Sequence, residues 1–94
     1  MRRVHWAGDA LRDLGQIDDW YEERDPDFAD TVGDAALSAA NFLLNFPLAG
    51  PIYYGKVRKW PVPNTDYRLL YRVVGEVIEI VRVRHAREDA EKIF

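Results

Sequence analysis

The sequence contains no cysteine, which excludes a disulfide framework, a thiolate metal site and a cysteine nucleophile. Its two histidines, His5 and His85, lie too far apart in sequence to suggest a metal site, so we expect neither a metal nor another cofactor. No apolar run approaches the roughly 18–20 residues of a membrane-spanning helix. The charged start of the chain reaches Asp9 without the apolar stretch of a signal peptide. These absences predict a cytoplasmic protein that does not enter a membrane.

What is present fits one folded domain. The chain has 94 residues, of which 48% are hydrophobic and three are tryptophans, so it is too apolar to remain disordered. A second domain would need roughly another 50 residues, and we therefore expect a single domain over residues 1–94. A domain of this size buries only about 60–65% of its unfolded surface, which makes its stability marginal and a stabilising partner useful.

The charges are distributed unevenly along the chain. Residues 1–50 hold four Lys or Arg and ten Asp or Glu, whereas residues 51–94 hold nine Lys or Arg and six Asp or Glu. This asymmetry suggests a polarised surface whose basic part meets an anionic partner, such as RNA or an acidic protein segment. Two structural elements with differently charged solvated faces would give the same counts, so charge alone leaves both interpretations open.

Two amphipathic helices are predicted in the first half. The apolar stripe of the first has helical spacing and consists of Ala10, Leu14, Ile17 and Tyr21. Asp9 is placed to cap its N-terminus. Its polar side is expected to carry Asp13, Asp18, Asp19, Glu22 and Glu23. Asp25-Pro26 predicts the start of the second helix, which should end before Pro47. The short connection makes the two helices an antiparallel hairpin.

The rest of the chain favours strands, as does the segment 3–6. Strands are predicted over 56–60, 66–74 and 77–84 from their β-branched and aromatic residues. Gly75-Glu76 is a two-residue loop with glycine first, which is typical of a type II′ hairpin. That loop predicts the cross-strand pairs Arg72–Glu79, Leu70–Val81 and Arg68–Val83. The arginines should then gather at the end of the sheet beside His85.

These elements predict an α+β fold in the order β-α-α-β-β-β. A short edge strand comes first, and the helical hairpin packs on one face of a small, mostly antiparallel sheet.

Several local stretches, in this order, make the chain resemble the RelE/ParE superfamily of toxins from type II toxin–antitoxin systems. The helix exit around Pro47 and Gly50 is similar to the family's "L-x-x-x-P-x-x-G", and Val57-Arg58 to its "[LV]-R" strand. The stretch 67–73 resembles "Y-R-[IVL]-x-Y-x-[VI]", and 81–89 resembles the ending "[IV]-x-x-V-x-H-x-R-[DE]". The resemblance spans almost the whole chain and implies a toxin that forms a hetero-oligomer with a cognate antitoxin.

The superfamily has two main target classes. RelE-like members cut mRNA in the ribosomal A site, and ParE-like members interfere with DNA gyrase. A RelE-like nuclease needs a general base, cations at the phosphate and a general acid. The residues here that match such a set are Arg58, Arg68, His85 and Arg87. Residues 90–94 contain no tyrosine, and Tyr54 stands where a second lysine is expected, so the resemblance favours ParE.

We therefore expect a ParE-like gyrase inhibitor that is not an enzyme, neutralised by a ParD-like antitoxin. An mRNA endonuclease and a non-catalytic regulator that binds the antitoxin are the alternatives. Candidate target-binding residues are seven of the basic side chains in the second half: Lys56, Arg58, Arg68, Arg82, Arg84, His85 and Arg87. Candidate antitoxin anchors are the aromatic residues Trp20, Tyr21 and Phe28 on the helical hairpin. The alternative interpretation is that Arg68 and Arg72 are ordinary exposed strand residues and that His85 is a polar residue at a strand end.

Overall fold

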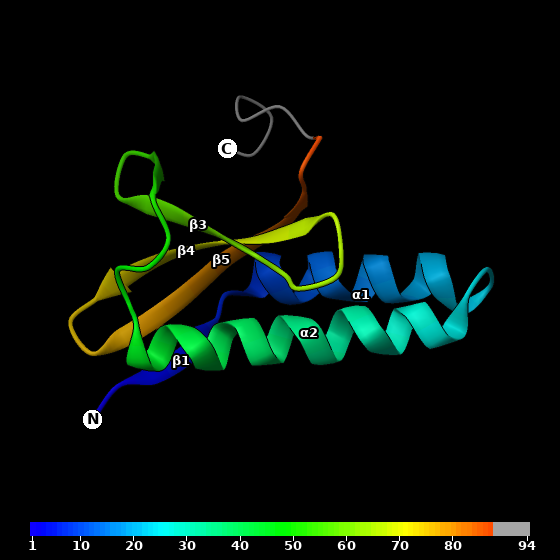
Figure 1. Ribbon diagram of the computed structural model, residues 1–94, viewed down its shortest axis with the longest axis horizontal. Coiled ribbons are helices and arrows are strands. Elements are labelled where there is room, and N and C mark those ends of the chain that lie inside the picture. Colours follow the sequence, from blue (N-terminus) through cyan, green and yellow to red (C-terminus); the bar gives the residue numbers. More distant parts are fainter. Residues whose placement is uncertain (88–94) are drawn as a thin grey trace.

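The computed structural model describes residues 1–87, which form two helices and one mixed sheet. The elements are β1 (Arg3–Trp6), α1 (Gly8–Glu22), α2 (Pro26–Asn45), β2 (Ile52–Tyr54), β3 (Val57–Pro61), β4 (Tyr67–Val74) and β5 (Val77–His85). The strands lie in the order β1-β5-β4-β3-β2, and β1 pairs with β5 in parallel while the other pairs are antiparallel. Figure 1 shows α1 and α2 side by side against the sheet. The predicted α+β fold is confirmed, with β2 as an additional strand at the far edge.

The two helix starts differ in how they are capped. The Asp25 side chain accepts a hydrogen bond from the Phe28 amide at 3.2 Å, with Pro26 in the first turn, as predicted. The prediction for Asp9 was wrong, because α1 begins at Gly8 and Ala7 is its N-cap without a side-chain bond. The Ala7 amide donates to the Ile80 carbonyl at 2.9 Å, and the chain passes from β1 into the helix two residues earlier than predicted.

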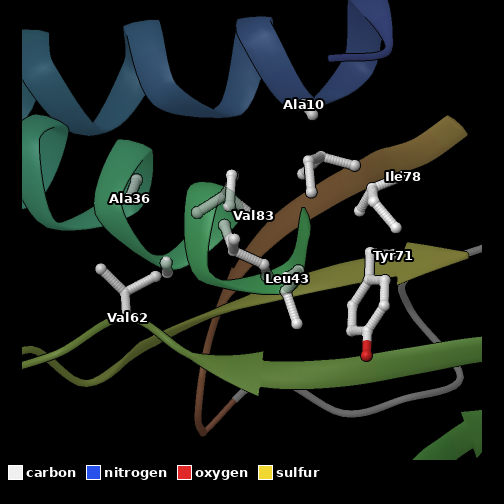
Figure 2. Close-up of a cluster of buried hydrophobic side chains, with 11 residues drawn as sticks. Ala10, Ala36, Leu43, Val62, Tyr71, Ile78 and Val83 are labelled. Carbon is white, nitrogen blue, oxygen red and sulfur yellow. The ribbon is translucent and has the colours of Figure 1, made fainter. Parts of the chain in front are cut away.

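The core lies between the helical hairpin and the sheet (Figure 2). Ala10 of α1 and Ala36 of α2 are fully buried, and their small side chains let both helices approach the sheet closely. Leu43, Tyr71 and Ile78 fill the same cluster and are also fully buried. Tyr71 and Ile78 therefore mark the faces of β4 and β5 that point toward the helices.

The β4–β5 hairpin carries an irregularity that the predicted register lacks. Near Gly75 the pairing is as expected, with Arg72 opposite Glu79. The register then shifts between Leu70 and Tyr71, so that Arg82 lies opposite Leu70 and Val83 opposite Leu69. The predicted pairs Leu70–Val81 and Arg68–Val83 were therefore wrong. One extra residue in β5 places buried Val83 in the core, where a regular ladder would have directed an arginine.

The connection from α2 to β2 is fixed by one buried phenol. The Tyr71 hydroxyl donates to the Pro47 carbonyl at 2.8 Å and accepts from the Gly50 amide at 3.0 Å. A Cβ on Gly50 would lie 2.3 Å from the Lys59 carbonyl oxygen, so only glycine fits this position. The helix exit noted in the sequence thus sets how the segment before β2 enters the sheet.

Candidate functional site

Asp13, which was predicted to lie on the polar side of α1, instead joins the helix to the sheet. Asp13 is 9% exposed. Its two oxygens accept hydrogen bonds from Arg82 at 2.8 and 3.0 Å, and one of them also accepts from the Val83 amide at 3.0 Å. The prediction for Asp13 was wrong because it rested on helical spacing, which cannot reveal an arginine 69 residues away. This pair orients the end of β5, where the candidate site residues lie.

A polar pocket of about 240 Å³ lies between α1 and that end of β5. Its walls come from Asp13, Gln16, Ile17, Trp20, Tyr67, Val83, Arg84 and His85. The pocket brings together a predicted antitoxin anchor, Trp20, and two predicted target-binding residues, Arg84 and His85. A partner bound at Trp20 would therefore stand next to the basic end of the sheet.

His85 ends β5 and is held by its neighbours. Its ring packs edge-on against Tyr67 with centroids 5.3 Å apart. Its Nδ1 accepts a hydrogen bond from the Arg87 amide at 3.2 Å, and its Nε2 lies 4.0 Å from the Asp66 carboxylate. Nδ1 is thus occupied as an acceptor, and Nε2 is the ring nitrogen that faces the carboxylate.

Arg58 has a structural partner on the helix side of the sheet. Its Nη1 donates to the Gly50 carbonyl at 2.8 Å. Arg58 lies opposite Tyr71, and residues directly opposite in a ladder point to the same face. Burial raises the pKa of the Tyr71 hydroxyl, while its hydrogen bond from the Gly50 backbone and the Arg58 charge act in the other direction.

Arg68 occupies the opposite face from Arg58. It is three residues from Tyr71 along β4, and side chains alternate between the faces of a strand. Arg68 lies directly opposite Arg84 in the β4–β5 ladder. Residues directly opposite in a ladder point to the same face, so the two arginines share one face at this end of the sheet.

The remaining basic candidates are placed differently. Arg82 is bound by Asp13, whereas Lys56 is exposed in the turn between β2 and β3 and Arg87 is exposed just after β5. The four residues of the nuclease set therefore come from both faces and from the end of the sheet. Residues Glu88 and Asp89 of the family-like ending, and the tail 90–94, lie outside the described residues.

A second hollow, of about 340 Å³, lies beside Arg68. Its lining includes the aromatic residues Trp60 and Tyr67, the basic residues Lys59 and Arg68, and the acidic Asp66. Sequence spacing gave no sign of this hollow, because its lining comes from β3, β4, the loop between them, Pro51 before β2 and Ala86 after β5.

The predicted antitoxin anchors lie at the far end of the hairpin. Trp20 is 55% exposed, and the Arg24 guanidinium lies 3.5 Å from its ring centroid. Tyr21 and Phe28 are half-buried and pack edge to face, with centroids 4.8 Å apart. Trp20 is thus available to a partner, whereas Tyr21 and Phe28 also hold the two helices together.

Two further properties concern the whole described chain. Within residues 1–87, no helix is long and apolar enough to cross a membrane. In the same range, no three His, Cys, Asp or Glu side chains form a group that could hold a metal ion.

The amino-acid sequence matches a family of known proteins over most of its length. Residues 4–90 match the family described as the ParE toxin of the parDE type II toxin–antitoxin system. Y4kP of Sinorhizobium fredii is 32% identical over 99% of this chain and 97% of its own length. Toxin RelE2 of Caulobacter vibrioides is 31% identical over 92% of this chain and 97% of its own.

Solved structures share the fold over nearly the same extent. The chromosomal ParDE system of P. aeruginosa matches with a TM-score of 0.78 and 25% identity, covering 90% of this chain and 96% of that one. The RelBE2 toxin–antitoxin complex of Mycobacterium tuberculosis matches with a TM-score of 0.62 and 24% identity, covering 89% and 96%. Both similarities extend across the helices and the sheet described above.

Proposed function

Because this chain belongs to the ParE toxin family of type II toxin–antitoxin systems, we propose that it inhibits DNA gyrase and that a ParD-like antitoxin neutralises it. In this proposal it acts in the cytoplasm as a binding protein and catalyses no reaction. Its target surface is the basic end of the sheet around Arg68 and Arg84, and Trp20 anchors the antitoxin. The family match and the placement of the arginines support this assignment.

The observation that carries the proposal is the separation of Arg58 from Arg68. A ribonuclease of the RelE kind needs its cations around one phosphate while an acid and a base act on either side of it. Here Arg58 is bonded to a main-chain carbonyl on the helix side, and Arg68 stands on the other face. Such an arrangement supports a binding surface better than a nuclease centre.

The opposed arginines also suit the proposed target. Arg68 and Arg84 place two cationic side chains opposite each other on one face of the sheet. Gyrase at work holds DNA, whose phosphates attract such a surface strongly at low salt. A ribosome-dependent mRNA endonuclease is the main alternative, and the similarity to a toxin named RelE2 is the observation in its favour.

Expression of the chain without its antitoxin in a bacterial host tests the proposal. Gyrase inhibition predicts growth arrest with filamentation and induction of the DNA-damage response while protein synthesis continues at first. A rapid fall in protein synthesis without DNA damage would contradict it and favour mRNA cleavage. Unimpaired growth would contradict both and favour a regulator that only binds the antitoxin.

A further inference from the structure

An exposed aromatic patch lies where the end of α2 meets the outer strands of the sheet. The Phe42 ring stacks on Phe46 with centroids 4.8 Å apart and on Trp60 of β3 with centroids 5.1 Å apart. Ile52 of β2 lies opposite Arg58, two residues before Trp60, so Ile52 and Trp60 both point to the helix side of the sheet. With the leucine in the turn after α2, the aromatic patch comprises Phe42, Phe46, Leu48, Ile52 and Trp60.

Most of the aromatic patch is open to solvent. Phe42 is 41% exposed, Phe46 56%, Leu48 65% and Ile52 55%, while Trp60 is half-buried against the core. A large aromatic side chain carries roughly 150–250 Å² of surface, so the exposed parts of the five residues amount to roughly 400 Å². Apolar patches of that size on monomers are often functional, so the aromatic patch indicates an interaction surface.

The area of the patch matches the apolar part of a dimer interface. A standard interface buries about 800 Å² on each partner, and about 65% of a homodimer interface is apolar. A twofold axis brings the same surface of both copies together, so one contact covers both patches. The aromatic patch therefore supplies most of the apolar surface that each copy needs for such an interface.

The charges around the patch favour a second copy of the chain as the partner. The chain has a net charge of −3, yet residues 35–65 contain no Asp or Glu, since all ten acidic residues of the first half lie between Asp9 and Asp34. Two copies that met along that acidic segment would repel each other, whereas residues 42–60 bring no carboxylates together. Arg58 shares the face of Ile52, but its Nη1 already donates to the Gly50 carbonyl at 2.8 Å. An acidic partner would therefore gain little from this arginine.

The edge strand β2 is not suited to pairing with another chain. It has three residues and follows Pro51, which has no amide hydrogen, and its ladder with β3 is irregular between Ile52 and Tyr54. Short edge strands with a proline or a bulge are protected against strand addition. A second copy should therefore pack on the side chains of the patch rather than extend the sheet.

The patch lies away from the proposed binding surfaces. The 20 residues of α2 span roughly 30 Å at 1.5 Å each. Trp20 belongs to the end of α1 that precedes the start of α2, whereas Phe46 directly follows the end of α2. Neither Arg68 nor Arg84 belongs to the patch, so covering it requires neither the antitoxin anchor nor the basic end of the sheet.

We propose that two copies of this chain form a homodimer in which their aromatic patches pack face to face about a twofold axis. Each copy buries its patch against the other and keeps Trp20 and the basic end of the sheet available to other partners. The dimer therefore presents two target surfaces instead of one. This inference goes beyond the proposed function, since it holds whichever target the toxin acts on.

Sedimentation equilibrium of the purified full chain over about 1–500 μM tests the inference. We expect the mass of the wild-type chain to rise from 10.9 kDa to twice that value. Phe46→Glu and Ile52→Glu should each raise the dimer dissociation constant at least about 30-fold, because each removes an apolar contact and places a carboxylate against the other copy's patch. An interface held by apolar contacts should not weaken as the salt concentration rises.

Leu37→Glu is the matched control. Leu37 is 54% exposed on α2, close to the 56% of Phe46, and it lies nine residues earlier, which is the opposite side of a helix with 3.6 residues per turn. The substitution introduces the same carboxylate, so the dimer dissociation constant should stay within about twofold of the wild-type value.

Circular dichroism melting curves show whether each variant still folds. Phe46, Ile52 and Leu37 are all more than half exposed, so the three glutamate variants should retain a cooperative transition. Phe46→Ala takes the place of a glutamate variant that fails to fold, and it should raise the dissociation constant about tenfold.

Several results would overturn the inference. A wild-type chain that stays monomeric at the highest concentration would exclude the homodimer, and weaker antitoxin binding by Phe46→Glu would then assign the patch to the antitoxin. Dimers that persist unchanged in Phe46→Glu and Ile52→Glu would place the interface elsewhere on the molecule. An equal loss in Leu37→Glu would show that added charge, and not the aromatic patch, determines the association.

Discussion

Arg82 of β5 donates two hydrogen bonds to Asp13 of α1, from Nε to Oδ2 at 2.8 Å and from Nη2 to Oδ1 at 3.0 Å. The same Oδ2 accepts the Val83 amide at 3.0 Å, so the carboxylate also satisfies the backbone of a strand. The pair is largely shielded from water, with side-chain exposures of 11% for Asp13 and 23% for Arg82. It holds the helical hairpin against the strand end that carries Arg84 and His85.

Asp13→Ala is therefore expected to lower the free energy of unfolding by about 2–3 kcal/mol, because it removes the carboxylate that accepts hydrogen bonds from Arg82 and from the Val83 amide. The value lies below the range for fully buried pairs, since Arg82 retains some contact with water. Asp9→Ala, which breaks the exposed pair with Arg12, should cost less than about 1 kcal/mol. Urea denaturation of the two variants measures both. Equal losses would show that the Asp13 pair contributes no more than a surface ion pair.

Tyr71→Phe is expected to destabilise the chain by about 1–3 kcal/mol, because the Gly50 amide and the Pro47 carbonyl lose their partner in a buried place. Unfolding in denaturant near pH 7 measures this loss. An unchanged midpoint would mean that the hydroxyl does not fix the loop.

The pH dependence of the same residue has a definite sign. Burial raises the pKa of Tyr71 above its ordinary 10.0 in the folded state. Above pH 10 the unfolded chain loses this proton while the folded chain keeps it, so the phenol's contribution to stability decreases as pH rises from 10 towards the raised folded value. Below pH 10 that contribution is fully present. The wild-type chain should lose stability more steeply than Tyr71→Phe as the pH rises above 10, and parallel curves would contradict the buried phenol.

Arg68→Glu separates target binding from folding. Replacing one of two opposed arginines by a carboxylate should leave stability unchanged or raise it by up to about 1 kcal/mol, because it turns a like-charge pair into a complementary one. Gyrase inhibition should fall at least tenfold. Arg72→Ala removes a cation that already pairs with Glu79 and serves as the control, with inhibition close to wild type. Full inhibition by Arg68→Glu would remove Arg68 from the proposed target surface.

Trp20→Ala tests the predicted antitoxin anchor. Exposed tryptophans at interfaces commonly contribute about 2 kcal/mol or more, so antitoxin affinity should fall about 30-fold or more. The stability of the isolated chain should change by less than about 0.5 kcal/mol, because 55% of the residue is exposed. Leu48→Ala, at an even more exposed apolar residue elsewhere, should leave the affinity unchanged. If both substitutions reduce binding equally, Trp20 has no special role.

The sequence was sufficient for the elements and the fold class. Helical spacing in α1 and α2 and the Asp25-Pro26 start signal are local patterns, and the structure follows them. The Gly75-Glu76 loop also behaves as predicted, since Gly75 has a φ of +59°. The short strand β2 was missed because three residues next to a turn carry too little periodicity to recognise.

The site was predicted less well, for a physical reason. Valine and arginine alternate over Val81–Arg84, so a ladder shifted by one residue shows the same alternation. The cost of burying an arginine against the helices selects the shifted register that is observed. That shift changes what Arg82 and Arg84 can reach. Likewise, Asp13 and Arg82 each look like solvated charges until the fold brings them together. The arginine cluster beside His85 was foreseen, but the separation of Arg58 from Arg68 on opposite faces was not.

The most direct test of the gyrase assignment uses the purified chain in two parallel reactions. One follows supercoiling and DNA cleavage by gyrase, and the other follows mRNA on translating ribosomes. We expect the chain to block supercoiling or trap cleaved DNA while the mRNA remains intact. Cut mRNA with unaffected gyrase would contradict the proposal and make His85 the first residue to examine as an acid or base.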